Sequence, residues 1–373
     1  MGLADAMSLR GPSVLALAAL ALAACGSDDG SASATNAPPA YDAAADGAPE
    51  AAPSTDAGDA SAADAHDGAD GSGGPGDAGG EDGSDAAPSC PSPALADVLT
   101  FTLTHAADPN SGHPDVAVHV PPGFDPCRRP SLVVFFHGFD NCVQNVVGSV
   151  DTACTPGGPT RSALHLDDQL DAARVNALLV AVEIVFDQAT GVPGHLADPG
   201  EFAAMLHELC ATHLSPLVGA PLDVASFEKI VLASHSGGYE SVGSVLDVGG
   251  VEVSEVELFD SLYGYYPSYA GWIEADLARF GPGAAKPRRF SDVFTSTGGT
   301  QALSETLEAE VEAALAPAGL SASLFYQDAT APTPTDAELA HPLVWKHSEL
   351  THDGVPRYYF GRLVAEAGIA PLP

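Results

Sequence analysis

The chain has 373 residues, with 13 Lys and Arg against 50 Asp and Glu, and a formal net charge of −37. A surface this negative repels nucleic-acid phosphates and anionic lipid headgroups, so we expect neither as a direct partner of the folded part. Composition divides the chain into three parts: an export signal at 1–25, a tract of Ala, Asp, Gly, Ser and Pro at 26–89, and a domain at 90–373 that is long enough to bury one sizeable core.

The first part is typical of a bacterial lipoprotein signal. An apolar stretch from Val14 to Ala24 is too short to span a bilayer, and its ending, Leu22-Ala-Ala-Cys25, resembles a lipobox in which Cys25 becomes the acylated N-terminus. We expect an exported protein on the periplasmic or cell-surface side of a bacterial membrane, attached through its lipid only. An ordinary cleaved signal is the alternative. A start at Met7 would give the signal a more conventional positive end.

The tract at 26–89 contains almost no large apolar side chain and no Lys or Arg. It cannot bury enough apolar surface to offset the chain entropy lost on folding. We therefore predict a disordered, acidic and self-repelling linker between the lipid and the domain.

Five cysteines remain once Cys25 is lipidated, an odd number for an oxidising compartment. Cys142 and Cys154 bracket a loop that contains Gly, Thr and Pro, and are the best candidates for a disulfide. The cysteine spacings do not resemble a zinc site, and we expect no metal. His207 and His213 do not form a zinc-binding helix either, because residues six apart point to different helix faces.

Within the domain, apolar runs alternate with helical patterns. Continuous apolar runs suit strands that are covered on both faces, and their alternation with helices predicts a doubly wound, mostly parallel α/β sheet. Pro356 can open the last helix. The expected strands are 98–104, 116–120, 131–136, 177–185, 229–233, 256–259 and 290–295, and the expected helices are 164–173, 201–213, 238–246, 304–316 and 357–367.

The segment Ser234-His-Ser-Gly-Gly238 joins an expected strand to an expected helix. In such a sharp turn the central side chain is exposed in a strained conformation, and the next backbone N–H points into the same space. Ser236 is therefore the candidate nucleophile. The usual motif is G-x-S-x-G, and Ser234 stands in place of its first glycine. A Ser/Gly turn without chemistry is the alternative interpretation.

A serine nucleophile needs a base and an acid that orients the base, here in the chain order Ser, acid, His. Asp260 follows the expected strand 256–259 and is the candidate acid; an Asp that caps a helix or forms a turn is the alternative interpretation. His352 lies in a turn before the last helix, where a base can return to the serine. The rivals are Asp328 and Asp353 for the acid, and His347 and His341 for the base.

The loop His137-Gly-Phe139 follows the expected strand 131–136, and in such a sheet it lies beside the turn that holds the serine. The backbone N–H groups of Phe139 and Gly237 are the candidate donors to an oxyanion. Loss of one such donor typically lowers the rate by about 10² to 10³.

Together these motifs resemble the α/β-hydrolase fold superfamily, and in particular secreted esterases of the polyhydroxyalkanoate-depolymerase and feruloyl-esterase kind. The resemblance implies a triad of Ser236, Asp260 and His352 that cleaves small-molecule or polymeric carboxylic esters through an acyl-enzyme, without a cofactor. The acid follows the sixth strand, whereas the seventh is usual; there Thr297-Gly-Gly-Thr300 holds no carboxylate. The segments that carry the resemblance are 118–124, 135–139, 234–238, 258–264 and 351–356.

Two other functions are compatible with these residues. An amidase or peptidase would use the same triad, because the acyl-enzyme chemistry is shared. A non-catalytic surface lipoprotein could instead keep the fold as a binding module. The aromatic segment 261–290 would form a lid or acyl pocket in either enzyme, or would simply pack on the sheet.

Overall fold

The computed structural model describes residues 98–188, 192–328 and 333–373, with the side chain of Asp328 excepted. The predicted signal at 1–25, the lipidation site Cys25 and the predicted linker at 26–89 lie outside the described residues. No helix in the described ranges is both long enough and apolar enough to cross a membrane.

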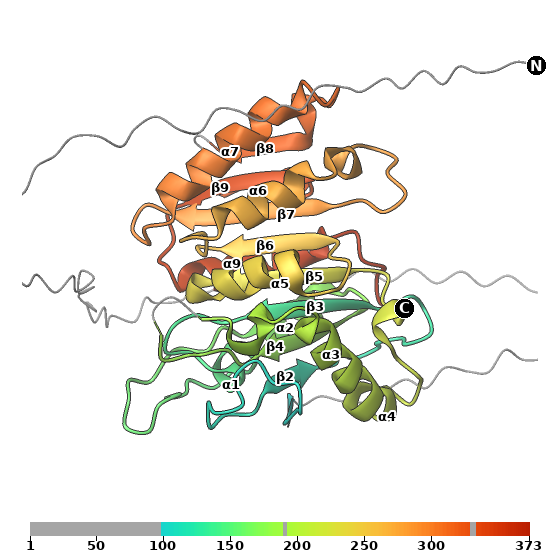
Figure 1. Cartoon of the computed structure of the whole chain (residues 1–373), viewed down its shortest axis with the longest axis vertical. Helices are drawn as coiled ribbons and strands as arrows, with labels where there is room; N and C mark the ends of the chain where they lie inside the picture. The colour runs from blue at the N-terminus through green and yellow to red at the C-terminus, as the bar shows by residue number, and fades with distance from the viewer. Residues whose placement is uncertain (1–97, 189–191, 329–332) are drawn as a thin grey trace, which may run out of the picture. The chain divides into compact units, whose positions relative to one another are not determined.

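The described part is built on a nine-stranded sheet with the order β1-β2-β4-β3-β5-β6-β7-β9-β8 (Figure 1). β2 pairs antiparallel with β1 and β4, and every other pairing is parallel. This confirms the doubly wound, mostly parallel α/β sheet. The strands are β1 Leu99–Phe101, β2 Val116–His119, β3 Ser131–Phe136, β4 Ala177–Val182, β5 Ile230–His235, β6 Glu255–Phe259, β7 Arg289–Thr295, β8 Phe325–Asp328 and β9 Leu343–Ser348.

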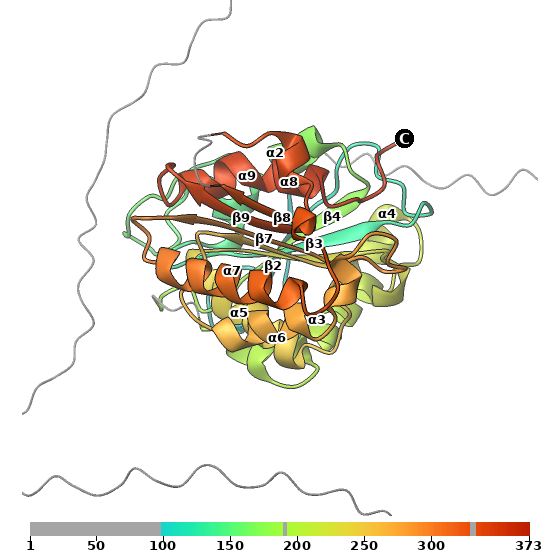
Figure 2. The ribbon, with the colours of Figure 1, turned by 90° about the horizontal axis from the view of Figure 1, so that it is seen from above.

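Helices cover both faces of the sheet (Figure 2). One face carries α1 Val143–Val147, α2 Leu166–Ala173, α8 Asp336–Leu339 and α9 Gly354–Ala365. The other carries α3 Glu201–Glu208, α4 Ser215–Val218, α5 Tyr239–Val248, α6 Tyr266–Glu274 and α7 Gln301–Leu315. A π-helical stretch, η2 Leu209–Leu214, joins α3 to α4; the 3₁₀ turns are η1 Gly194–Ala197, η3 Val224–Ser226, η4 Ser236–Gly238, η5 Leu277–Phe280 and η6 Ala322–Leu324.

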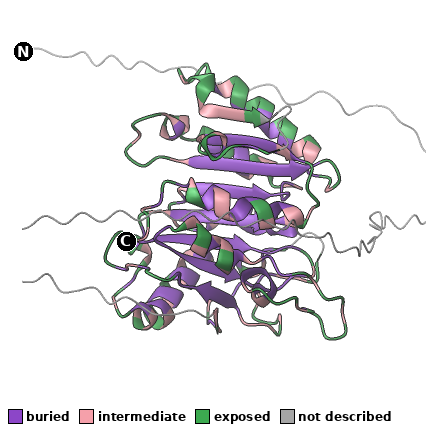
Figure 3. Cartoon of the chain, turned by 180° about the vertical axis from the view of Figure 1, so that it is seen from behind, coloured by how far each residue is buried: buried purple, intermediate pink, exposed green. Residues whose placement is uncertain are grey.

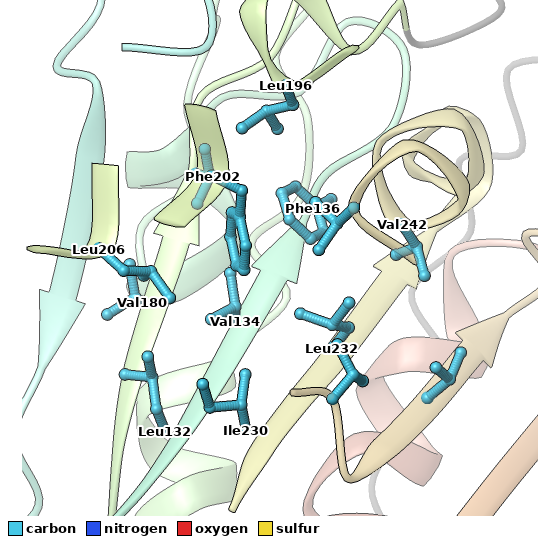
Figure 4. Close-up of a cluster of buried hydrophobic side chains, with 14 of the residues drawn as sticks. Leu132, Val134, Phe136, Val180, Leu196, Phe202, Leu206, Ile230, Leu232 and Val242 are labelled. Atoms are coloured by element: carbon cyan, nitrogen blue, oxygen red, sulfur yellow. The ribbon is translucent and has the colours of Figure 1, made fainter. Parts of the chain in front are cut away.

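Side chains alternate between two apolar clusters because successive strand residues point to opposite faces. On β3, Val134 and Phe136 pack toward α3 and α5, where they meet Phe202 and Val242 (Figure 4), while Phe135 joins the cluster beneath α9. The central strands are buried along their length, and the helices expose their outer sides (Figure 3). Each fully buried Val, Leu or Phe contributes about 1.5–3 kcal/mol relative to exposure, so the apolar runs hold the sheet together.

All seven expected strands are present, and the structure adds β8 and β9, which the sequence analysis missed. β9 reads Leu-Val-Trp-Lys-His-Ser, and its charged lysine hides its strand character. Lys346 is nevertheless buried, with Nζ donating to the carbonyl of His347 at 2.7 Å. Helices α1, α4, α6 and α8 were also not anticipated, and the last helix begins at Gly354, two residues before Pro356.

The aromatic segment 261–290 mostly packs inside the domain. Its helix α6 lies against α5 and α7, and Tyr269 is fully buried, with its hydroxyl donating to the Tyr239 carbonyl at 2.6 Å. Tyr263 lies beside the predicted base, with its ring 6.4 Å from that of His352. Of the two interpretations of this segment, a lid or simple packing, helix α6 therefore agrees with packing.

Candidate active site

Ser236 lies where β5 turns sharply into α5. Its φ of +52° is in the left-handed region, which costs a non-glycine residue about 1–2 kcal/mol and is kept where the surroundings enforce it. Glycines permit the crowding around this turn. A Cβ on Gly138 would lie 2.6 Å from the Ser236 Cβ, and one on Gly238 would lie 2.4 Å from the Phe136 carbonyl oxygen. The loop after β3 therefore runs directly against the serine.

Ser234, which replaces the first glycine of the usual motif, is fully buried and hydrogen bonded. Its hydroxyl lies 2.8 Å from that of Ser261, and Ser261 donates to the carbonyl oxygen of Ser236 at 2.8 Å. The added side chain thus fits the turn and connects β5 to the segment after β6.

Asp260 and His352, which the sequence predicts as acid and base, are in contact. Asp260 follows β6 with a φ of +47° and is fully buried. His352 Nδ1 lies 2.7 Å from Asp260 Oδ2. Because a carboxylate only accepts, Nδ1 carries the proton and Nε2 of the neutral ring has a free lone pair. This is the tautomer that a general base requires.

Two threonines complete the surroundings of the Asp260 carboxylate. The Thr295 backbone N–H donates to Oδ1 at 3.0 Å and its hydroxyl to Oδ2 at 2.7 Å, while the Thr300 hydroxyl donates to Oδ1 at 2.5 Å. Burial raises the pKa of Asp260, but hydrogen bonds from His352 and Thr300 outweigh it and hold that pKa below its usual value. The carboxylate is therefore ionised at neutral pH.

Ser236 and His352 line one cavity of about 150 Å³. Among the described residues their side chains form no hydrogen bond with each other, although apo geometry of this kind does not exclude a base from acting on a neighbouring hydroxyl. Phe139 is 40% exposed at the same cavity, and Gly237 is buried next to Ser236. The other lining residues are Asn141, Arg161, Ser162, Leu164, His235 and Asp353.

His235 packs against the predicted base, His352. The two imidazole rings lie 4.4 Å apart, and His235 Nε2 is 3.2 Å from the His352 carbonyl oxygen. Burial, followed by the neighbouring His352, lowers the pKa of His235 to about 3. A neutral His235 adds no charge that would compete with protonation of His352.

The rival residues lie elsewhere or make other contacts. Asp328 ends β8 at the edge of the sheet, and β9, β7 and β6 separate that strand from β5. Asp353 also lines the cavity. Its Oδ1 is paired with His235 Nε2 at 3.9 Å, whereas Nδ1 of His352 is bonded to Asp260. His347 bonds to the Ser296 hydroxyl at 2.6 Å, and His341 Nδ1 bonds to the Glu338 carbonyl at 2.9 Å.

A buried polar network around Glu183, which the sequence analysis missed, contacts the loop after β3. Glu183 Oε1 lies 2.6 Å from His113 Nδ1, and its Oε2 accepts the Val143 N–H at 3.0 Å and lies 3.5 Å from His137 Nε2. Burial raises the pKa of Glu183, but the two histidines and Val143 bring it below its usual value. The feature of the sequence that could have indicated this network is the glutamate near the end of the apolar run 177–185.

The predicted Cys142–Cys154 disulfide is present, and His113 Nε2 bonds to the Cys154 carbonyl at 2.6 Å. Cys210 is a free, buried thiol whose pKa is raised to about 12 by burial.

The histidines His207 and His213 lie in different surroundings. His207 pairs with Asp223 at 2.7 Å, and His213 stacks on Phe101 at 4.4 Å, so the two histidines do not share a site.

Among the described residues, one group could offer a metal three ligand atoms within 4.8 Å of one another: His235, His352 and Asp353. His352 already gives Nδ1 to Asp260, and His235 gives Nε2 to the His352 carbonyl. Both histidines therefore already have one hydrogen-bond partner each in the described part of the chain.

No protein family model matches this sequence, and no curated protein sequence matches it. The chain is similar to solved structures of esterases and related hydrolases. One is a mutant of the feruloyl esterase module from Clostridium thermocellum complexed with sinapinate, at 13% identity and a TM-score of 0.44, covering 72% of this chain and 87% of that one. A siderophore hydrolase from Aspergillus nidulans shows 11% identity and a TM-score of 0.39, covering 75% and 97%.

A ferulic acid esterase from Anaeromyces mucronatus, solved with ferulic acid, shows 11% identity and a TM-score of 0.38, covering 74% of this chain and 90% of that one. The mostly parallel sheet with its antiparallel β2 and the strand-turn-helix at β5 agree with the α/β-hydrolase fold that the sequence motifs predict. At identities of 11–13% and TM-scores below 0.5 these likenesses carry no argument about activity, so the chemistry rests on the residues of this chain.

Proposed function

We propose that this protein is a serine hydrolase that cleaves carboxylic esters, with Ser236 as nucleophile, His352 as base and Asp260 as the acid that orients it. The observation that carries the proposal is the 2.7 Å contact between His352 Nδ1 and Asp260 Oδ2 beside a strained serine that lines the same cavity. Strain at a buried turn and a base with a fixed tautomer are features that nucleophilic catalysis uses.

In the proposed reaction, His352 Nε2 accepts the hydroxyl proton as Ser236 Oγ forms a bond to the ester carbonyl carbon. The carbonyl π electrons move to oxygen, and the backbone N–H groups of Phe139 and Gly237 stabilise that charge. When the tetrahedral intermediate collapses, the alkoxide leaves with the proton from His352. Water then attacks the acyl-enzyme with His352 again as base, which releases the acid and restores Ser236.

We further propose that the enzyme is exported and held at a bacterial membrane by acylation of Cys25, with residues 26–89 as the linker. The support is the Leu22-Ala-Ala-Cys25 ending of the apolar segment and the composition that follows it. Labelling with radioactive palmitate should mark the mature protein and be lost in Cys25→Ala. A soluble, unlabelled mature protein that begins elsewhere would refute the anchor without touching the hydrolase proposal.

Mass spectrometry after treatment with a fluorophosphonate probe tests the nucleophile. A single adduct on Ser236 that is absent from Ser236→Ala is expected. The absence of an adduct on folded protein would favour the non-catalytic binding module, which shares the fold. Rates on p-nitrophenyl butyrate and on the matching p-nitroanilide then separate the esterase from an amidase or peptidase that uses the same triad.

A further inference from the structure

A second cavity of about 300 Å³ lies away from the candidate active site, between α7 and the strands β7, β9 and β8. These elements gather at one end of the sheet, where α7 lies across the strands (Figures 1 and 2). The proposed hydrolase reaction makes no use of this space. It is lined by Phe294, Glu305, Glu308, Ala309, Glu312, Gln327, Trp345 and His347.

Three carboxylates form the helical wall of this cavity. Glu305, Glu308 and Glu312 are spaced three and four residues apart on α7, so they share one face, and like charges at these spacings repel. Within the described ranges none of the three forms an ion pair with Lys, Arg or His. Glu305 accepts a hydrogen bond from Gln301 at 2.6 Å. In the part of the chain that the structure describes, the helix thus concentrates negative charge without an ion-pair partner.

Glu308 is the buried member of this wall. Only 5% of the residue is exposed, and its Oε1 has no hydrogen-bond partner among the described residues. A buried carboxylate oxygen without a partner is costly, so its presence at a cavity points to a ligand that supplies the missing positive group. Burial, together with Glu312 and Glu305, raises the pKa of Glu308 to about 7, and a hydrogen bond with Gln327 offsets only part of this increase.

The sheet wall of the cavity is aromatic. Phe294 and His347 stack with ring centroids 5.3 Å apart, and Trp345 is buried against Phe325 at 4.9 Å. Aromatic rings attract cations through their negative faces and also accommodate alkyl groups. An acidic wall opposite an aromatic wall is the arrangement that favours an alkylated ammonium group.

We propose that this cavity binds an organic ammonium ion, with the charge beside Glu308 and its neighbours on α7 and the alkyl groups against Phe294 and Trp345. A single metal ion fits less well, because the three glutamates do not bring their oxygens within 4.8 Å of one another. A wider cation, with its charge spread over several alkyl groups, can meet separated carboxylates.

Calorimetric titration of the full chain with choline chloride tests the proposal, with 3,3-dimethyl-1-butanol as the neutral analogue of the same shape. Ionic strength is held constant with sodium chloride. We expect saturable binding of choline and binding of the neutral analogue that is weaker by about tenfold or more. Equal binding of the two compounds, or no binding of choline, would overturn the proposal.

Two matched variants locate the site. Glu308→Gln keeps the size of the side chain and removes a repelling charge, so it should fold, which circular dichroism checks. Choline affinity should fall by about tenfold in this variant. Glu310→Gln removes one charge from an exposed position of the same helix outside the cavity and should leave affinity unchanged. Equal losses in both variants would assign binding to the overall charge and refute the site.

Two further measurements distinguish this cavity from the candidate active site and from a metal site. Ser236→Ala should bind choline with the same affinity as the wild type, because the cavity does not include the serine. Loss of binding in Ser236→Ala would place choline in the candidate active site and contradict the proposal. Displacement of choline by calcium chloride at equal concentration and ionic strength would also contradict it, since that result indicates a metal site.

Discussion

The hydroxyl oxygens of Ser234 and Ser261 lie 2.8 Å apart, and Ser261 also bonds to the Ser236 carbonyl oxygen at 2.8 Å. A carbonyl only accepts, so the single proton of Ser261 points to Ser236, and Ser234 must donate to Ser261. The side chain that departs from the usual glycine therefore belongs to a chain of hydrogen bonds that ends on the strained serine.

Ser261→Ala should lower stability more than Ser234→Gly. The alanine leaves both the Ser236 carbonyl and the buried Ser234 hydroxyl without their partner, at a cost of about 1–3 kcal/mol. Ser234→Gly keeps the bond from Ser261 to Ser236. Denaturant unfolding of the two variants measures the difference, and the reverse order would contradict this hydrogen-bond chain.

Asp260→Asn should lower kcat by about 10⁴-fold on an ester substrate, because the amide disturbs the His352 tautomer that the carboxylate holds. Asp353→Asn, at the same cavity, and Asp328→Asn, at the sheet edge, should each change kcat less than tenfold. Steady-state rates on p-nitrophenyl butyrate provide the measurement. A larger loss in either control would reassign the acid.

Gly298→Ala should reduce activity by displacing the same carboxylate. A Cβ at this glycine would lie 2.3 Å from Asp260 Oδ2, so the side chain or the loop must move. Near-attack geometry is sensitive to shifts of this size, and about 10²-fold is the expected loss in kcat. Gly271→Ala, whose Cβ meets nothing within 4 Å, is the matched control and should retain full activity.

Arg161 should favour esters that carry a carboxylate. Its side chain lines the catalytic cavity, with Nη2 donating to Asp140 at 3.0 Å and Nε without a partner in the described part of the chain. We expect Arg161→Gln to lower kcat/KM for p-nitrophenyl hemisuccinate by about tenfold. The rate on the neutral p-nitrophenyl butyrate should change less than twofold; equal losses on both would indicate a purely structural role.

Stability should depend on pH through Asp292, which is fully buried on β7. Burial, followed by the charges of Asp260 and Glu308, raises its pKa from 3.8 to about 8. The folded state therefore holds a proton that the unfolded chain releases near pH 4. The contribution of this proton to the free energy of unfolding is complete below pH 4 and is lost as pH rises to about 8. The loss is at most about 1.4 kcal/mol per pH unit. Asp292→Asn should gain stability relative to the wild type between pH 5 and pH 8 in urea unfolding. A constant difference across that range would show that Asp292 is ionised.

Local patterns were sufficient for much of the fold. Apolar runs such as 131–136 are buried on both faces of the sheet, and a run of this kind marks a strand wherever it lies in the chain. β9 shows the limit of this reasoning, because Lys346 is buried by contacts that its neighbours in sequence do not reveal. Ser236, Asp260 and His352 were identified as candidates because each lies at the end of an element whose type could be predicted.

The sequence by itself determined the alternation of strands and helices, the strained turn at Ser236 and the short list of acids and bases. Only the tertiary structure shows which members of that list meet, because residues 92 positions apart, Asp260 and His352, come into contact only when β6 and α9 pack in the same domain. The same reason explains Thr295 and Thr300, the Glu183 network and the acidic-aromatic cavity under α7. Each depends on distances between separate elements, and periodicity along one chain carries no information about those distances.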